Sequence, residues 1–427
     1  MCISTTNQED VIMGDGNLDW MDIDKDALLH DGVYQPTPAL PVEMWSYIFS
    51  WIPSVEDQLN VAIVCRNWSF ICSLLTCSEL NLRVRLNQDD IIIAFCRRFS
   101  GLRQLILTDC LYATGRIYRC LPPQLEQIVV RNCPAIGRTA FEMDLRHLPL
   151  FLQKISLSRF QHVGESMLRR LPSGLRDLNL ANCPKMKCSF LQLLPSSLES
   201  LDLSGMMDND TTPSSYDIFR HSNLKRLSLC GATLPPGFLV HLPTTLTALD
   251  LTDYNGAVGN SLHRLSHLQR LKMDRAGVPE ELPENLLALS IRGCHLEVGE
   301  KFLGKSLHLE ELYISGTVRD VRAWPKHLKH LYISHKTLSQ YEVDCLPPTL
   351  TKLTLVYCEV DAVSLNPLLA LEELRIHSNL LSQFPRLDEN FVTFSRGWKH
   401  MYIDGPCHPL TLAQLTRRPD LTITHYP

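Results

Sequence analysis

The chain has 427 residues, 45% hydrophobic and 20% charged, so it is long enough to bury a large core and too apolar to be disordered throughout. Its 41 Lys and Arg against 46 Asp and Glu give a net charge of −5, which excludes the whole-chain basic field expected of a general nucleic-acid or anionic-membrane binder. No apolar run approaches the roughly 18 residues of a membrane helix.

Residues 1–36 form an acidic tail. Eight Asp and Glu stand against one base, Lys25, which gives a charge of −7 (1 minus 8). The tail has no basic segment followed by an apolar stretch, so it does not resemble a secretory signal, and we expect an intracellular protein of the cytoplasm or nucleus. The composition predicts disorder, although residues 18–29 (LDWMDIDKDALL) mix acidic and apolar residues as docking peptides do.

Residues 40–75 predict three short helices. Pro41 suits a first helical turn, and Glu43 complements the helix dipole there. Pro53 ends the first helix, after an apolar stripe at i, i+4 spacing. The stripe consists of Met44, Trp45, Ile48, Phe49 and Ile52.

These helices resemble the F-box, whose pattern opens with Leu-Pro-x-Glu, continues to Ile-Phe and closes near Val-Cys-Arg-x-Trp. The matching residues are Leu40, Pro41, Glu43, Ile48, Phe49, Val64, Cys65, Arg66 and Trp68. The resemblance implies that residues 37–76 form a small three-helix F-box module that docks on a Skp-family adaptor bound to a cullin. Its implied adaptor contacts are Leu40, Pro41, Trp45, Ile48, Phe49, Val64, Cys65 and Trp68. The alternative is a helical cap over the open core of the first repeat.

The pattern Leu-x-x-Leu-x-Leu, with conservative exchanges, recurs fourteen times, from LRQLIL at Leu102 to WKHMYI at Trp398. The starts span 398 minus 102, or 296 residues, over 13 intervals, a mean near 22.8. This period and signature resemble the leucine-rich repeat. The resemblance implies an α/β solenoid over residues 77–427, a horseshoe with a parallel concave sheet, about 14 repeats and a closing segment near LTLAQLTRRPDLTIT.

The fifteen cysteines include no CxxC pair, which predicts reduced, buried thiols. Six bends after predicted strands carry the Cys or Asn that the repeat family places there, and such groups can hydrogen-bond neighbouring backbone. These residues are Cys110, Cys133, Cys183, Cys294, Cys358 and Asn379. No HExxH motif, paired Cys/His spacing, phosphate loop or nucleophile elbow occurs, so we expect no metal, no cofactor and no catalytic residues.

Alternate strand positions of such a sheet face the concave side. Early and middle repeats place small or acidic residues there, namely Asp177, Asn179, Asp202 and Asp250. Late repeats place larger groups there, namely Arg292, Tyr313, His330, Tyr332, Lys352, Arg375, His377, His400 and Tyr402. Because Tyr and Arg dominate binding hot spots, we predict that the late residues bind a protein substrate. The alternative is a merely solvated sheet face.

Taken whole, the chain resembles F-box proteins with leucine-rich repeats. The resemblance implies a non-catalytic, substrate-recognition subunit of a Skp-cullin-F-box ubiquitin ligase, in which the repeats hold the protein to be ubiquitinated. The alternative function is a scaffold or inhibitor that binds its partner through the solenoid alone.

Overall fold

The structure is a computed structural model. It describes residues 11, 12, 44, 79–83, 88–99, 101–139, 144–161, 163–208, 223–279, 281–294, 303, 308–315, 324–336, 338–358, 368, 370–377, 399–404 and 422–426. Two compact units divide the chain, the first made of residues 1–186 and 193–198 and the second of residues 187–192 and 199–427. The predicted F-box module, residues 37–76, lies outside the described residues except for Met44.

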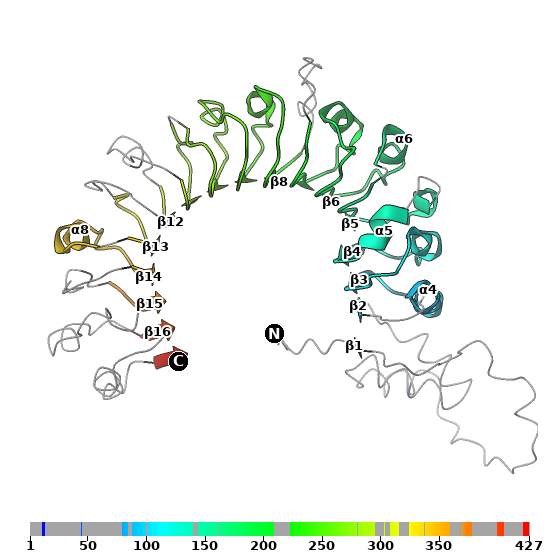
Figure 1. The fold of residues 1–427 in the computed structure, drawn as a ribbon, viewed down its shortest axis with the longest axis horizontal. Helices are drawn as coiled ribbons and strands as arrows, with labels where there is room; N and C mark the ends of the chain where they lie inside the picture. Colours follow the sequence, from blue (N-terminus) through cyan, green and yellow to red (C-terminus); the bar gives the residue numbers. More distant parts are fainter. Residues whose placement is uncertain are drawn as a thin grey trace, which may run out of the picture. The chain divides into compact units, whose positions relative to one another are not determined.

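The first unit holds a parallel sheet with one short strand per repeat (Figure 1). Its strands are β1 (Val11–Ile12), β2 (Glu79–Arg83), β3 (Gln104–Thr108), β4 (Gln127–Arg131), β5 (Lys154–Ser156) and β6 (Asp177–Asn179). The segments that connect the strands hold α4 (Gln88–Arg98), η1 (Gly115–Cys120), α5 (Pro134–Thr139), η2 (Asp144–His147) and α6 (Glu165–Leu168). The η elements are 3-10 helices, and a further one, η3 (Cys188–Leu193), follows β6 in the chain.

The second unit continues the same construction (Figure 1). Its strands are β7 (Ser200–Asp202), β8 (Arg226–Ser228), β9 (Ala248–Asp250), β10 (Arg270–Lys272), β11 (Ala288–Ile291), β12 (Glu311–Ser315), β13 (His330–Ser334), β14 (Lys352–Val356), β15 (Glu373–His377), β16 (His400–Asp404) and β17 (Thr422–Tyr426). The helices η5 (Phe238–His241) and α8 (Gln340–Asp344) lie on connecting segments. Within this unit the strands line the inner side of the curve, and the connecting segments lie outside.

The repeat pattern produces this fold because its apolar positions stack in register. In the repeat that contains β12, Leu309, Leu312 and Ile314 are completely buried. Leu312 pairs with Leu289 on one side and Leu331 on the other, so the leucines form continuous columns inside the solenoid. Each fully buried Leu contributes about 1.5–3 kcal/mol of transfer free energy. All fourteen predicted motifs contain a strand, and the predicted leucine-rich-repeat solenoid with a parallel sheet is confirmed.

In most described repeats, the turn after the strand contains a residue with a left-handed backbone conformation. Unit one uses Asp109, Asn132, Arg159 and Asn182 there, and unit two uses Gly205, Gly231, Asp253, Arg275, Gly293, His335 and Tyr357, with φ between 50° and 68°. Gly, Asn and Asp adopt this region at low cost, whereas bulkier residues do so at about 1–2 kcal/mol each.

The cysteines in these bends hydrogen-bond neighbouring backbone as predicted. The thiol of Cys183 donates to the Leu157 carbonyl at 3.2 Å, and that of Cys133 donates to the Leu107 carbonyl at 3.6 Å. Cys110, Cys294 and Cys358 make equivalent bonds, so the prediction is confirmed at five of its six positions. Asn379 lies outside the described residues. Among the helices that the structure describes, none has the length and apolarity to cross a membrane.

Candidate functional site

The concave face of strands β12–β16 in the second unit, with Arg292 after β11, is called here the late concave surface. Its side chains form rows, because parallel strands in register bring equivalent positions side by side. One row, the charged row, contains Glu311, His330, Lys352, Glu373 and His400. The next, the aromatic row, contains Tyr313, Tyr332, Thr354, Arg375 and Tyr402. The third row, at the strand ends, contains Ser315, Ser334, Val356, His377 and Asp404. Large polar and aromatic groups therefore meet across five neighbouring strands.

Aromatic rings and guanidinium groups contact one another along the aromatic row. The rings of Tyr313 and Tyr332 lie 5.8 Å apart, and the guanidinium of Arg292 lies 5.6 Å from the centre of the Tyr332 ring. At the other end of the row, the Arg375 guanidinium lies 4.4 Å from the Tyr402 ring centre. These cation–π geometries orient both arginines. Small Thr354 lies between the two clusters in the row.

Carboxylates from the flanking rows contact Arg375 and nearby lysine and histidine side chains. Glu373 accepts a hydrogen bond from Arg375 and lies 3.1 Å from Lys352 Nζ. Burial raises the pKa of Glu373, but the bonds from Arg375 and Lys352 outweigh that effect and lower the pKa below its usual range. His377 Nδ1 lies 3.0 Å from Asp404, and His330 Nδ1 lies 3.6 Å from Glu311. Pairing of this kind limits the side-chain entropy that binding would cost.

Asp274 fixes the position of Arg292. Asp274 is 2% exposed. Its carboxylate accepts hydrogen bonds from Arg292 Nη2 at 2.7 Å, Arg292 Nε at 3.0 Å, the Arg292 backbone N–H at 2.9 Å and Ser290 Oγ at 2.6 Å. The Arg292 side chain keeps 41% of its surface exposed, so Asp274 orients the guanidinium while part of it stays accessible to solvent. The sequence prediction missed Asp274. The available signal was an acid two residues after the strand, at the position that the three preceding repeats fill with Thr252, Cys230 and Ser204.

The early concave residues have a different role. Asp202 accepts hydrogen bonds from the backbone N–H and hydroxyl of Ser204, and Asp250 accepts the same pair from Thr252. The amide oxygen of Asn179 accepts from the Ala181 N–H in the same way. These side chains close the turns that follow their strands.

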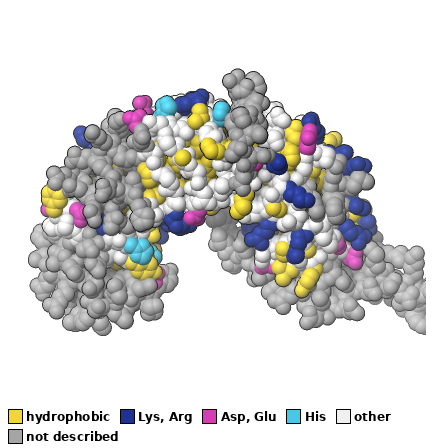
Figure 2. Space-filling model, turned by 45° about the horizontal axis from the view of Figure 1, so that its top comes forward, with side chains coloured by type: hydrophobic (Ala, Val, Ile, Leu, Met, Phe, Trp, Pro, Cys, Tyr) yellow, Lys and Arg dark blue, Asp and Glu magenta, His cyan; other side chains and the backbone are white. Residues whose placement is uncertain are grey.

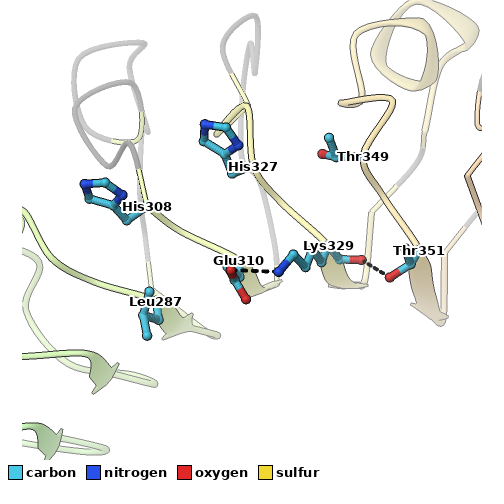
Figure 3. Close-up of a pocket in the computed structure, with 7 residues that line it drawn as sticks. All are labelled: Leu287, His308, Glu310, His327, Lys329, Thr349 and Thr351. Carbon is cyan, nitrogen blue, oxygen red and sulfur yellow. Dashed lines mark hydrogen bonds and ion pairs between the residues drawn. The ribbon is translucent and has the colours of Figure 1, made fainter.

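A cavity of about 540 Å³ opens at the edge where strands β11–β14 begin (Figure 3). It is lined by Leu287, His308, Glu310, His327, Lys329, Thr349 and Thr351. Glu310 and Lys329 form an ion pair of 2.8 Å across it, and Thr351 donates to the Lys329 carbonyl. None of the predicted substrate-binding residues lines this cavity.

The structure brings all nine predicted substrate-binding residues to one surface of the second unit, with His400 exposed and the other eight partly exposed. It adds the carboxylates of Asp274, Glu311, Glu373 and Asp404, all of which follow the same two-residue alternation. The predicted adaptor residues, Leu40, Pro41, Trp45, Ile48, Phe49, Val64, Cys65 and Trp68, lie outside the described residues.

Residues 37–75 match the family model described as F-box-like. Among curated proteins, no sequence matches the chain. Among solved structures, the chain is similar to a leucine-rich-repeat protein of Leptospira interrogans, with 19% identity, a TM-score of 0.47, and coverage of 87% of this chain and 98% of that one. It is also similar to CroV588, a circular leucine-rich-repeat protein, with 16% identity and a TM-score of 0.48. That match covers 76% of this chain, which spans only 46% of the CroV588 chain.

The chain thus combines an F-box-like segment with leucine-rich repeats that follow it directly. This combination is typical of non-catalytic receptors and scaffolds, in which one part joins an assembly and the other binds a protein.

Proposed function

We propose that this protein is the substrate-recognition subunit of a Skp-cullin-F-box ubiquitin ligase. The F-box-like segment docks on the Skp-family adaptor, and the late concave surface binds the protein to be ubiquitinated. The chain itself is non-catalytic in this proposal and acts in the cytoplasm or nucleus. The observation that carries it is the F-box-like match at residues 37–75 immediately before a solenoid with a pre-organised binding surface.

The late concave surface supports the receptor role on physical grounds. Tyr332 and Tyr402 offer large ring areas with few rotatable bonds, and Arg292 and Arg375 are already oriented by their partners. Hot spots favour these residue types, and pre-orientation reduces the cost of ordering them on binding. A curved parallel sheet also presents its side chains to a folded partner over a long surface.

Co-purification of the full chain with a Skp-family adaptor and cullin tests the first half of the proposal. We expect the intact chain to retain both proteins, and we expect Trp45→Ala/Phe49→Ala and a deletion of residues 37–76 to lose them while circular dichroism shows a folded sheet. If the intact chain retains no adaptor, the scaffold or inhibitor alternative replaces this proposal, with the helices acting as a cap.

A triple variant, Tyr313→Ala/Tyr332→Ala/Tyr402→Ala, tests the second half. It should keep the adaptor and lose the adaptor-dependent ubiquitination targets that the intact chain enriches. Tyr112→Ala/Tyr341→Ala is the matched control, since both rings are exposed and lie outside the aromatic row. Unchanged enrichment by the triple variant would remove the late concave surface from the proposal.

A further inference from the structure

One repeat of the first unit carries an apolar pair where the other repeats are polar. Seven repeats contain Leu-Pro-x-x-Leu before the strand. In six of them the two middle residues are Pro-Gln, Ser-Gly, Ser-Ser, Thr-Thr, Glu-Asn or Pro-Thr. In the seventh, before β5, they are Leu150 and Phe151, which are 85% and 65% exposed. We name these two residues the Leu-Phe patch.

The backbone does not require this apolar pair. Leu152 N–H donates to the Pro149 carbonyl at 3.1 Å, and Leu198 N–H donates to the Pro195 carbonyl at 3.2 Å in the repeat whose middle pair is Ser-Ser. In that repeat Ser197 Oγ also bonds the backbone of the preceding repeat, at Ser173 and Leu175. Phe151 cannot donate such a bond. The exposed pair therefore costs solvation without supporting the turn, which is typical of a surface that another segment covers.

The surroundings of the Leu-Phe patch are basic. Arg146 lies four residues before Leu150, is exposed and has no ion pair among the described residues. On the next repeat, Arg176 donates its backbone N–H to the Gln153 carbonyl, two residues after Phe151. Residues 77–186 carry 16 Lys and Arg against 9 Asp and Glu, a net charge of +7 (16 minus 9). Figure 2 shows these cations gathered over the right-hand side, where the first unit lies.

The acidic tail has the complementary chemistry. Its charge of −7 is equal and opposite to that of residues 77–186. Within residues 18–29, the acids Asp19, Asp22 and Asp26 follow i, i+3, i+7 spacing. The apolar residues Trp20, Ile23 and Ala27 follow the same spacing one position later. In a helix, the acids and the apolar residues would therefore lie on two adjacent faces.

The tail also reaches the first unit. Strand β1 pairs in parallel with β2, with Val11 opposite Leu82 and Ile12 opposite Arg83. Strands β1 and β5 are four strand spacings apart, about 19 Å. The eleven Cα–Cα steps from Ile12 to Ile23 can span about 36 Å when extended. This length also allows the chain to cross from one end of the strands to the other.

We propose that residues 18–29 of the chain's own tail dock on the Leu-Phe patch. Their apolar residues cover Leu150 and Phe151, and their acids face Arg146 and Arg176. Three separate observations carry this: an exposed apolar pair that the turn does not need, opposite charges on the two partners, and a strand that anchors the tail beside the same sheet.

Hydrogen–deuterium exchange of the full chain, read by mass spectrometry, tests the docking. In the wild-type protein we expect amides of residues 18–29 to exchange at least about tenfold more slowly than in Leu150→Ser/Phe151→Ser. That variant gives this turn the same Pro-Ser-Ser sequence as residues 195–197, so the turn should keep its fold. Trp20→Ala/Ile23→Ala changes only the tail and should lose the same protection. Val240→Ser/Tyr341→Ser, which removes exposed apolar groups from the second unit, should leave the protection unchanged.

The protection should also fall as sodium chloride rises from about 50 mM to about 500 mM, because salt screens the exposed charges. Unprotected wild-type residues 18–29 would overturn the proposal. Protection that persists in Leu150→Ser/Phe151→Ser would also overturn it, because the tail would then rest on another surface and the Leu-Phe patch would belong to a second copy or a different partner.

Discussion

Removing the carboxylate of Asp274 should destabilise the second unit and disorder Arg292. In Asp274→Ala, Ser290 and the Arg292 backbone N–H each lose an acceptor, and the Arg292 side chain loses both of its bonds to Asp274. In Asp274→Asn, the remaining oxygen can still accept from Ser290 and the backbone N–H. The two variants therefore separate the bonds from the uncharged donors, Ser290 and the backbone N–H, from the ion pair with the Arg292 side chain.

The magnitude follows from these contacts. A neutral hydrogen bond contributes about 1 kcal/mol and a bond to a charged group about 1.5–3 kcal/mol. The Arg292 side chain is 41% exposed and regains water when its partner is lost, so its contribution belongs at the low end of that range. We expect Asp274→Ala to lower the free energy of unfolding by about 3 kcal/mol and Asp274→Asn by about 1.5 kcal/mol, as measured by urea unfolding.

The pH dependence gives this reasoning a second test. Burial alone raises the pKa of Asp274, but the hydrogen bonds from Arg292 and Ser290 outweigh it and lower the pKa below its usual range. A carboxyl with a lower pKa in the folded than in the unfolded state stabilises the fold above the unfolded value, near 3.9, and loses that effect as pH falls through the folded value. The difference between wild type and Asp274→Asn should therefore narrow below about pH 4. A difference that stays constant from pH 7 to pH 3, or a cost for Asp274→Ala below about 1 kcal/mol, would refute the account.

Three further predictions concern local features. Arg159→Gly should raise the free energy of unfolding by about 0.5 kcal/mol, because release of the left-handed strain exceeds the entropy cost of Gly; a destabilised variant in urea unfolding would contradict this. Ser339→Ala should cost about 1 kcal/mol in the same assay, since Ser339 and Glu342 form the capping box of α8, and Ser339→Asp should recover most of it. Burial raises the pKa of Cys96 to about 12, so this thiol should resist iodoacetamide at pH 8 until urea is added, as read by mass spectrometry; rapid native labelling would show that α4 does not bury it.

Much of the fold could be predicted from the sequence because the repeat signature is dense. Each Leu-x-x-Leu-x-Leu fixes three buried positions, and fourteen copies in register leave little freedom in the sheet. Strands β1, β2 and β17 were missed, because Val11–Ile12, Glu79–Arg83 and Thr422–Tyr426 lack the full motif. They become strands because a neighbouring strand, β2, β3 or β16, offers its edge for pairing. Such pairing depends on the neighbour and not on local sequence.

The candidate site could be predicted only in part. The two-residue alternation placed Tyr313 and Tyr332 on one face, because side chains of a strand alternate sides. The aligned motifs also place Tyr313 opposite Tyr332, since both fill the same motif position. Their ring contact and the position of the Arg292 guanidinium depend on side-chain rotamers, which the motif does not specify. Partners such as Asp274 belong to a different repeat from the residue that they hold. Which bonds form is therefore decided by stacking, one repeat against the next.

Bulky residues occupy the turn after the strand in several repeats, including two beside the late concave surface. Turns after strands in the second unit use Gly205 and Gly231 without strain, yet the late repeats place His335 and Tyr357 there, with rings 5.1 Å apart. Each bulky residue costs about 1–2 kcal/mol in this backbone region. Strain of this kind persists where the surrounding structure compensates for it, and Arg159 and Arg275 carry it in the same turn of other repeats. Because the turns with His335 and Tyr357 directly follow β13 and β14, the strands that carry Tyr332 and Thr354, these two rings lie at the edge of the late concave surface.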